Sequence, residues 1–307
     1  MDANVRHAMN ETIGADAPIG VFDSGIGGLT ILRKMRQALP NEHFIYFGDL
    51  GRAPYGTKSM ETVVRYASQI TRFLLSRNVK LVVIACNTAS AVAGDAVARL
   101  ASPVPVIEVV EHGAAAALDA LPASVWASGR GRVGIVATET TVASNVYRDR
   151  LLAMAASRGW PAPAIKQAAC QLFVALVETG FWTGEIPRLA AEHYLAEMRA
   201  FAPDVLILGC THFPPLRQAM ADVLPPATRL VDSAPNVARR ARRMLEERDA
   251  LHPGESPGTM TFYTSDSPES FRRHAERFLD VPIDIVHHVD VEAYEAKEGL
   301  CDRQNRH

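Results

Sequence analysis

The chain has 307 residues, of which 48% are hydrophobic and 21% charged, and its formal net charge is −2. This composition supplies enough apolar side chains for a sizeable core and excludes a wholly disordered chain. The nearly balanced charge gives no reason to expect nucleic acid or an anionic membrane as a partner, and no apolar run approaches the ~20 residues that span a bilayer.

Residues 1–17 contain acidic side chains and lack the apolar segment of a signal peptide. We expect residues 1–17 and 291–307 to be flexible tails and the protein to be cytoplasmic. The cysteines are too few and too scattered for a disulfide framework, so any sulfur chemistry must come from individual thiols. They are Cys86, Cys170, Cys210 and Cys301.

Strands and helices are predicted to alternate along the first half of the chain. Short β-prone apolar runs at residues 19–22, 43–47, 80–85 and 105–110 are bounded by glycine, proline or polar clusters. Between them, residues 60–78 carry apolar side chains at spacings of three and four, which predicts a helix with one buried face. Continuous apolar strands that alternate with helices indicate parallel sheets covered on both faces.

The second half repeats this plan. VGIVATETTVAS resembles IGVFDSGIGGLT, DVLILGCTHFPP resembles LVVIACNTASAV, and TRLVDSAPNVAR resembles VPVIEVVEHGAA. We therefore predict two similar α/β domains. The first domain comprises residues 18–111 and 229–290, with the strand TMTFYTS and the helix PESFRRHAERFL packing back on it, and the second comprises residues 112–228.

Two thiols follow equivalent strands of the two units. In parallel α/β folds, ligands bind beyond the carboxyl ends of the strands, where Cys86 and Cys210 are expected. Cys86 precedes a helix, whose N-terminus can lower a thiol pKa from ~8.5 towards neutrality, and His212 could act similarly on Cys210. Two such thiols across a cleft would provide the base and the acid that inversion of a stereocentre requires, with Asp23 and His212 as proton partners.

The loop FDSGIGGLT offers a place for a ligand carboxylate. Asp23 and Ser24 lie at a turn into a helix, and the glycines either allow close approach of a ligand or serve the turn alone. The loop is not a dinucleotide fingerprint, because Thr30 stands where the third glycine is required. GRAPYGTKS is not a P-loop, because Thr57 stands where the lysine is required.

These segments resemble the glutamate racemase family, whose enzymes supply D-glutamate for bacterial peptidoglycan. The segments GVFDSGIGGLT, YFGDLGRAPYG, VVIACNTASA, GIVATETTVAS, CQLFVALVETG and LGCTHFPPL occur in the family's order, from about Ile19 to Leu279. The resemblance implies two pseudo-symmetric flavodoxin-like domains with mainly parallel sheets and the active site in the cleft between them. It also implies an isomerase that needs neither cofactor nor metal.

The resemblance implies roles for individual residues. Cys86 and Cys210 correspond to the two catalytic bases, Cys86 acting on the D enantiomer and Cys210 on the L enantiomer, with Asp23 and His212 assisting. Substrate contacts are expected from Asp23, Ser24, Tyr55, Gly56, Asn87, Thr88, Thr211 and His212.

Three more residues match family positions with less specific roles. Thr138 and Thr141 correspond to hydroxyls near the side-chain carboxylate of the substrate, and Glu178 corresponds to a carboxylate that orients the histidine. The departures from the family pattern are Leu50–Gly51, where threonine and alanine are common, and Phe213, where tyrosine is common. None of them affects a role assigned above.

Several other functions fit parts of the pattern. Two cysteines and a histidine could ligate zinc in a hydrolase or lyase, although no C-x-x-C spacing is present. A non-catalytic module for an amino acid or similar small acid would bind glutamate but leave its α-proton unexchanged. A pyridoxal-dependent racemase is disfavoured, because Lys80 lies at the start of its strand, away from the site.

The resemblance also implies which substrate the protein acts on and how it assembles. Aspartate racemases share the two-thiol pattern and are the nearest alternative, but DSGIGG and GRAPYG favour glutamate as the small-molecule substrate. Dimers are common in the family, so a homodimer is a possible assembly.

Overall fold

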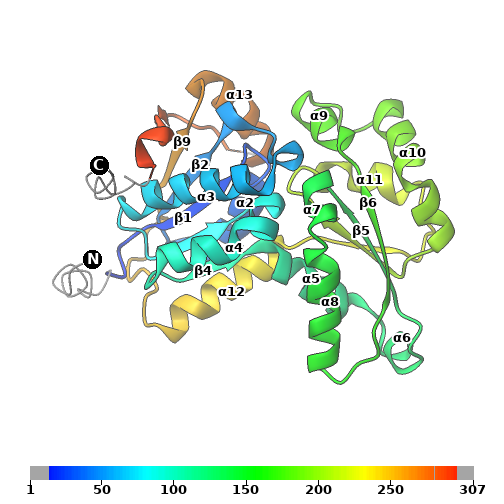
Figure 1. The fold of residues 1–307 in the computed structure, drawn as a ribbon. Coiled ribbons are helices and arrows are strands. Elements are labelled where there is room, and N and C mark those ends of the chain that lie inside the picture. The colour runs from blue at the N-terminus through cyan, green and yellow to red at the C-terminus, as the bar shows by residue number, and fades with distance from the viewer. Residues whose placement is uncertain (1–13, 280, 296–307) are drawn as a thin grey trace, which may run out of the picture.

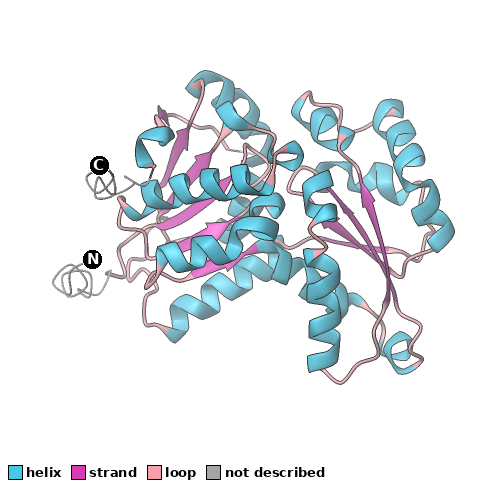
Figure 2. Ribbon diagram, viewed as in Figure 1, coloured by secondary structure: helices cyan, strands magenta, loops and turns pink. Residues whose placement is uncertain are grey.

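The computed structural model describes residues 14–279 and 281–295. Its two lobes lie side by side, and each is built on a sheet flanked by helices (Figures 1 and 2). The strand pairs of both sheets are parallel. The predicted α/β fold class with two parallel sheets is therefore confirmed.

The first lobe contains a six-stranded sheet in the order β10-β9-β2-β1-β3-β4. Its strands are β1 (Ile19–Asp23), β2 (Phe44–Gly48), β3 (Leu81–Ile84), β4 (Val106–Glu108), β9 (Met260–Thr264) and β10 (Val286–His288). Its helices are α2 (Leu29–Ala38), α3 (Met60–Leu75), α4 (Asn87–Ala101), α12 (Ala234–Glu247) and α13 (Pro268–Leu279).

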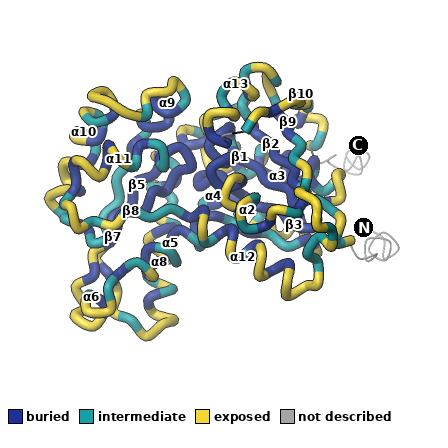
Figure 3. Tube along the Cα trace, turned by 180° about the vertical axis from the view of Figure 1, so that it is seen from behind, coloured by how far each residue is buried: buried dark blue, intermediate teal, exposed yellow. Residues whose placement is uncertain are grey.

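Helices cover both faces of this sheet. The side chains of α2, α12 and α13 share one apolar cluster with one face, and those of α3 and α4 share another cluster with the opposite face. Strands β1, β2 and β3 are buried throughout and run through the centre of the lobe (Figure 3). Burial on both faces explains why these strands are continuous apolar runs rather than alternating ones.

The second lobe contains a four-stranded sheet in the order β6-β5-β7-β8. Its strands are β5 (Arg132–Ala137), β6 (Ala164–Ala169), β7 (Val205–Gly209) and β8 (Arg229–Val231). The helices between β4 and β8 in the sequence are α5 (Val109–Ala120), α6 (Ala123–Ala127), α7 (Glu139–Ala143), α8 (Val146–Ser157), α9 (Leu172–Glu178), α10 (Glu185–Phe201) and α11 (Arg217–Ala221).

The strand orders reproduce the repeat that the sequence predicts. In each lobe the first strand lies between the second and the third, and the fourth lies beyond the third, as in β2-β1-β3-β4 and β6-β5-β7-β8. This is the flavodoxin-like arrangement. Strand β9 pairs with β2, so the segment TMTFYTS returns to the first lobe as predicted.

Two predicted segments differ in the structure. The strand predicted at residues 105–110 ends at Glu108, because the Glu108 carboxylate accepts hydrogen bonds from the backbone N–H groups of Val110 (2.6 Å) and Glu111 (2.9 Å) and begins α5. The tail predicted from residue 291 begins with the 3₁₀ helix η4 (Val291–Tyr294), in which Val291 is buried. The remainder of both predicted tails, at 1–13 and 296–307, lies outside the described residues, as does Cys301.

The domain boundaries remain a prediction. Strand β8 pairs with β7 in the four-stranded sheet, so strand pairing favours a boundary after Val231 over the predicted boundary between residues 228 and 229. Within the described part of the chain, no helix combines the length and the hydrophobicity that a membrane crossing requires.

A buried ion pair lies at the amino end of β3. Lys80 Nζ is 2.6 Å from Glu42 Oε2, and each side chain is 2% exposed. The ammonium also donates to the backbone carbonyl of Ala250 at 2.9 Å and to that of Ala15. Lys80 therefore holds three segments of the first lobe together, at the edge opposite to Cys86.

We expect Lys80→Met to lower the free energy of unfolding by about 3–5 kcal/mol, because Glu42 would keep an uncompensated buried charge. The double variant Lys80→Met/Glu42→Leu should recover part of that loss. Urea denaturation measures both. The control is Arg242→Met, which removes the exposed pair of Arg242 with Glu246 and should change stability by about 0.5 kcal/mol or less. A loss in Lys80→Met no larger than in the control would contradict this role.

Candidate active site

A small cavity lies between the lobes, and its lining comes from segments that directly follow strands of both sheets. Ser24 follows β1, Cys86 follows β3, Thr138 follows β5 and Cys210 follows β7. Both thiols thus lie at the carboxyl edges of their sheets and line the same cavity. The predicted site residues that share this lining with them are Ser24, Tyr55, Gly56, Asn87, Thr88, Thr138, Glu178, Thr211 and His212.

The cavity is closed. Its volume is about 20 Å³, which is room for a single water molecule, whereas sites for small ligands usually enclose ~300–1,000 Å³. The cavity as it stands therefore has no room for an amino acid. Sequence reasoning missed Ala53, Pro54 and Val174 in the lining, because nothing in their chemistry distinguishes them from packing residues.

Cys86 precedes a helix, as predicted, and is itself the N-cap of α4, but its thiol is not acidic. Its Sγ accepts a hydrogen bond from the backbone N–H of Ala89 (3.4 Å), and the thiol donates to Ser24 Oγ (3.7 Å). Burial and the nearby Asp23 carboxylate outweigh these bonds and raise the pKa of Cys86 to about 12. The helix N-terminus does lower the Cys86 pKa through the Ala89 N–H, but burial outweighs it, and Cys86 is a neutral thiol at pH 7.

Asp23 lies fully buried beside the cavity. Its carboxylate accepts hydrogen bonds from the backbone N–H of Gly25 (3.1 Å) and from Thr211 Oγ1 (3.4 Å), which comes from the other lobe. Burial raises the pKa of Asp23, and the positive charge of His212 and these hydrogen bonds oppose that rise. Asp23 thus joins the two lobes beneath the site.

His212 lies between a thiol and a carboxylate. Its Nδ1 is 3.9 Å from Cys210 Sγ, and its Nε2 is 3.2 Å from Glu178 Oε1. Burial disfavours the imidazolium, but the contacts with Cys210 and Glu178 together outweigh it and raise the pKa of His212 to about 10. The Glu178 contact is an ion pair rather than a well-directed hydrogen bond, because Nε2 has no hydrogen-bond partner among the described residues.

Tyr55 uses its hydroxyl within its own lobe. The hydroxyl donates to the buried Asp49, which also accepts from Arg52 Nε (2.8 Å) and Ser265 Oγ (2.6 Å). The proton of the Tyr55 hydroxyl is therefore engaged within the first lobe. Sequence reasoning missed this supporting network. The available signal was the acidic residue that follows strand β2 in YFGDLGRAPYG.

Hydroxyl groups from both lobes meet at one side of the cavity. Thr88 Oγ1 lies 3.0 Å from Thr138 Oγ1 and 3.3 Å from Thr141 Oγ1, and the last two are 3.0 Å apart. Asn87 Oδ1 accepts a hydrogen bond from the Tyr147 hydroxyl (2.6 Å) of the second lobe. The three threonine hydroxyls are thus paired with one another in the closed cleft.

Two glycines allow the lobes to approach closely. A Cβ atom on Gly27 would lie 2.4 Å from Thr211 Oγ1 and 2.6 Å from His212 Nδ1. A Cβ atom on Gly56 would lie 2.5 Å from Thr138 Cβ. Neither glycine has a positive φ angle. Close approach across the cleft, rather than a turn that only glycine adopts, thus accounts for both residues.

The geometry gives no support to the zinc alternative. Across residues 14–279 and 281–295, no group of three or more His, Cys, Asp or Glu side chains is arranged to hold a metal ion.

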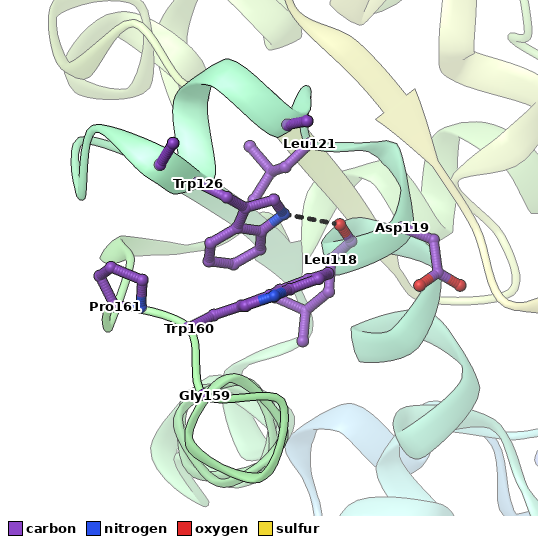
Figure 4. Close-up of a pocket in the computed structure, with 9 residues that line it drawn as sticks. Leu118, Asp119, Leu121, Trp126, Gly159, Trp160 and Pro161 are labelled. Carbon is purple, nitrogen blue, oxygen red and sulfur yellow. Dashed lines mark hydrogen bonds between the residues drawn. The ribbon is translucent and has the colours of Figure 1, made fainter.

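A larger pocket, of about 590 Å³, lies beside Trp126 and Trp160, whose ring centroids are 4.4 Å apart (Figure 4). Its described lining contains no thiol or histidine, and its one carboxylate, Asp119, is paired with Arg158 at 2.8 Å. Volume alone therefore does not identify the reactive site.

Known proteins resemble this chain over most of its length. Residues 19–241 match the sequence model of the Asp/Glu/hydantoin racemase family. The glutamate racemase of Geobacter metallireducens is 43% identical over 275 residues, which are 90% of this chain and 97% of that protein. The glutamate racemase of Syntrophus aciditrophicus is 44% identical over 262 residues, 85% of this chain and 92% of that protein.

Solved structures agree. The glutamate racemase of Francisella tularensis in complex with D-glutamate superposes with a TM-score of 0.82 at 37% identity, covering 91% of this chain and 100% of that one. The glutamate racemase of Thermus thermophilus in complex with β-chloro-D-alanine gives 0.76 at 40% identity, covering 91% and 99%. The family match, the extent of these similarities and the fold lead to one conclusion: the chain belongs to the Asp/Glu/hydantoin racemase family.

Proposed function

We propose that the protein is a glutamate racemase, which interconverts L- and D-glutamate by proton transfer between two thiols. The observation that carries the proposal is that Cys86 and Cys210, from equivalent positions in the two lobes, line one closed cavity. Relatives that cover about nine-tenths of the chain are named glutamate racemase, and one solved relative holds D-glutamate. Glutamate is therefore the substrate we assign.

The thiols on the two sides of the cavity suit the two proton transfers of the reaction, one removing the α-proton and the other replacing it. In the L-to-D direction, the Cys210 sulfur takes the α-proton as its S–H bond forms, and the His212 imidazolium, 3.9 Å away, stabilises the negative charge that this sulfur carries beforehand. The Cys86 thiol breaks its S–H bond and delivers its proton to the opposite face of the same carbon. The turnover leaves Cys210 as thiol and Cys86 as thiolate, ready for the D enantiomer. Asp23 is the proton partner that we assign to Cys86.

The remaining polar groups would hold the substrate. Because Tyr147 occupies Asn87 Oδ1, the amide of Asn87 is left to donate to a substrate oxygen. The paired hydroxyls of Thr88, Thr138 and Thr141 can reorient towards a carboxylate. Ser24, Thr211 and the backbone of Tyr55 and Gly56 complete the set of proposed contacts.

The function implies a place in the cell. We propose that the enzyme acts in the cytoplasm and supplies D-glutamate for peptidoglycan in the cell wall. We also propose a homodimer, which light scattering with and without glutamate tests directly.

The test of the proposed function is incubation of the purified protein with each enantiomer of glutamate and of aspartate, followed by circular dichroism. We expect the signal of both glutamate enantiomers to decay to zero, and that of aspartate to decay far more slowly. Faster decay with aspartate would assign the alternative substrate. No decay with any of the four would leave a binding module and overturn the racemase proposal.

We expect Cys86→Ala and Cys210→Ala each to lower kcat by about 10²- to 10⁴-fold, the usual contribution of an acid or base. The matched control is Cys170→Ala, which changes a buried cysteine outside the cavity lining and should keep most of the activity. Racemisation assays on the three variants measure this. Substantial activity in either single-thiol variant would contradict a two-base mechanism.

His212 should stabilise the fold in a pH-dependent way. Its pKa in the folded protein, about 10, lies above its ordinary value of about 6.5, so its contribution is fully present below pH ~6.5 and is lost as the pH rises through ~10. We expect His212→Asn to be less stable than the native protein by about 2 kcal/mol at pH 6, with a smaller difference at pH 10. Urea denaturation at both pH values measures it, and a difference that stays constant or grows with pH would contradict the assigned charge.

A further inference from the structure

One side chain of the second lobe binds the backbone of the first lobe beside the cavity. Thr140, in α7, places its Oγ1 2.9 Å from the carbonyl oxygen of Gly56 and 3.2 Å from that of Lys58. A threonine hydroxyl has a single proton, so it is shared between these two acceptors. No role was assigned to Thr140 from the sequence.

Helix α7 and its N-cap residue Thr138 present hydroxyls in two directions. Thr138 and Thr141 bond with Thr88 and lie almost fully buried beside the cavity. Thr140 is half-buried and bonds instead to the 3₁₀ helix η2 (Tyr55–Thr57) and the residue after it. The Thr140 hydroxyl therefore bonds to backbone of the first lobe, whereas the hydroxyls of Thr138 and Thr141 lie beside the cavity, where the proposed function places substrate.

The loop that Thr140 contacts is already fixed within the first lobe. Tyr55 is 1% exposed, its hydroxyl is bound by Asp49, and its ring packs 5.6 Å from that of Tyr66. The loop does not need Thr140 for its own order. The hydrogen bonds from Thr140 consequently join one ordered lobe to the other.

Opening of the cleft must break these bonds. With room for only about one water molecule in the cavity, the lobes have to separate before an amino acid enters. Gly56, which receives the bond from Thr140, is also the residue whose missing side chain lets Thr138 approach. Separation of α7 from η2 therefore releases Thr140, Thr138 and Gly56 together.

We propose that Thr140 is a positioning residue that latches α7 to the Tyr55–Gly56 loop and so favours the closed cleft. This inference rests on the proposed racemase function for its kinetic consequence, but not for the latch itself. The shared hydrogen bond is worth about a fivefold change in the ratio of closed to open protein, the usual net effect of one neutral hydrogen bond.

The test compares Thr140→Val, which keeps the shape and loses the hydroxyl, with Thr140→Ser, which keeps the hydroxyl. Hydrogen exchange of the full-length protein reports on residues 53–59 and 139–143, and racemisation assays report KM and kcat for glutamate. We expect Thr140→Val to exchange about fivefold faster in these two segments only. Because the latch closes the free and the substrate-bound cleft alike, KM for glutamate should change by much less than the exchange rate. Thr140→Ser should match the native protein in both measurements.

Three results would overturn the latch. They are native exchange in Thr140→Val, the same faster exchange in Thr140→Ser as in Thr140→Val, and faster exchange spread over the whole second lobe. The last would show that Thr140 only stabilises its own lobe. The exchange measurement does not depend on activity. If the native protein racemises nothing, the proposed function fails while the latch is still decided by exchange.

Discussion

The burial of the groups around the cavity between the lobes is the constraint on which the rest of the site depends. Burial penalises every charge that is not compensated by a neighbour. Cys86 has a carboxylate beside it and stays a neutral thiol, with its pKa raised to about 12. His212 has a sulfur and a carboxylate beside it and stays charged, with its pKa raised to about 10. The same buried environment thus keeps a neutral group on one side of the cavity and a charged group on the other.

This difference in charge arises between two lobes whose sheets share the same order of their first four strands. Two sheets with the same strand order bring the ends of β3 and β7 to one cavity, so the repeat explains why two thiols face one space. The repeat does not make their surroundings equal. The residue after Cys86 begins a helix, whereas Cys210 is followed by Thr211 and His212, which cross the cleft to approach Gly27. A reaction that inverts one carbon needs two similar groups in unlike states, and this arrangement is suited to supply them.

Much of the fold was predictable from the sequence, because strands buried on both faces are continuous apolar runs. That signal identified β1, β2 and β3, and the internal repeat identified β5, β7 and β8. It failed for β6, AIKQAA, which is mostly half-exposed at a sheet edge, and for the short β10. The candidate site was predictable from thiols, acids and hydroxyls after strand ends. The pKa of Cys86 was not, since a helix N-terminus is visible in sequence and the depth of burial is not. Thr140 and Asp49 escaped because their roles depend on contacts across long stretches of chain.

The central claim is that hydrogen leaves one face of the substrate carbon to one thiol and returns on the other face from the second. The most direct test is racemisation of L-glutamate in deuterium oxide, stopped at low conversion and analysed by mass spectrometry of the separated enantiomers. Because the donor thiol carries a solvent-derived proton, the account predicts deuterium at the α-carbon of the D-glutamate product and almost none in the remaining L-glutamate. Equal labelling of product and remaining substrate would indicate one base serving both faces and would contradict the account.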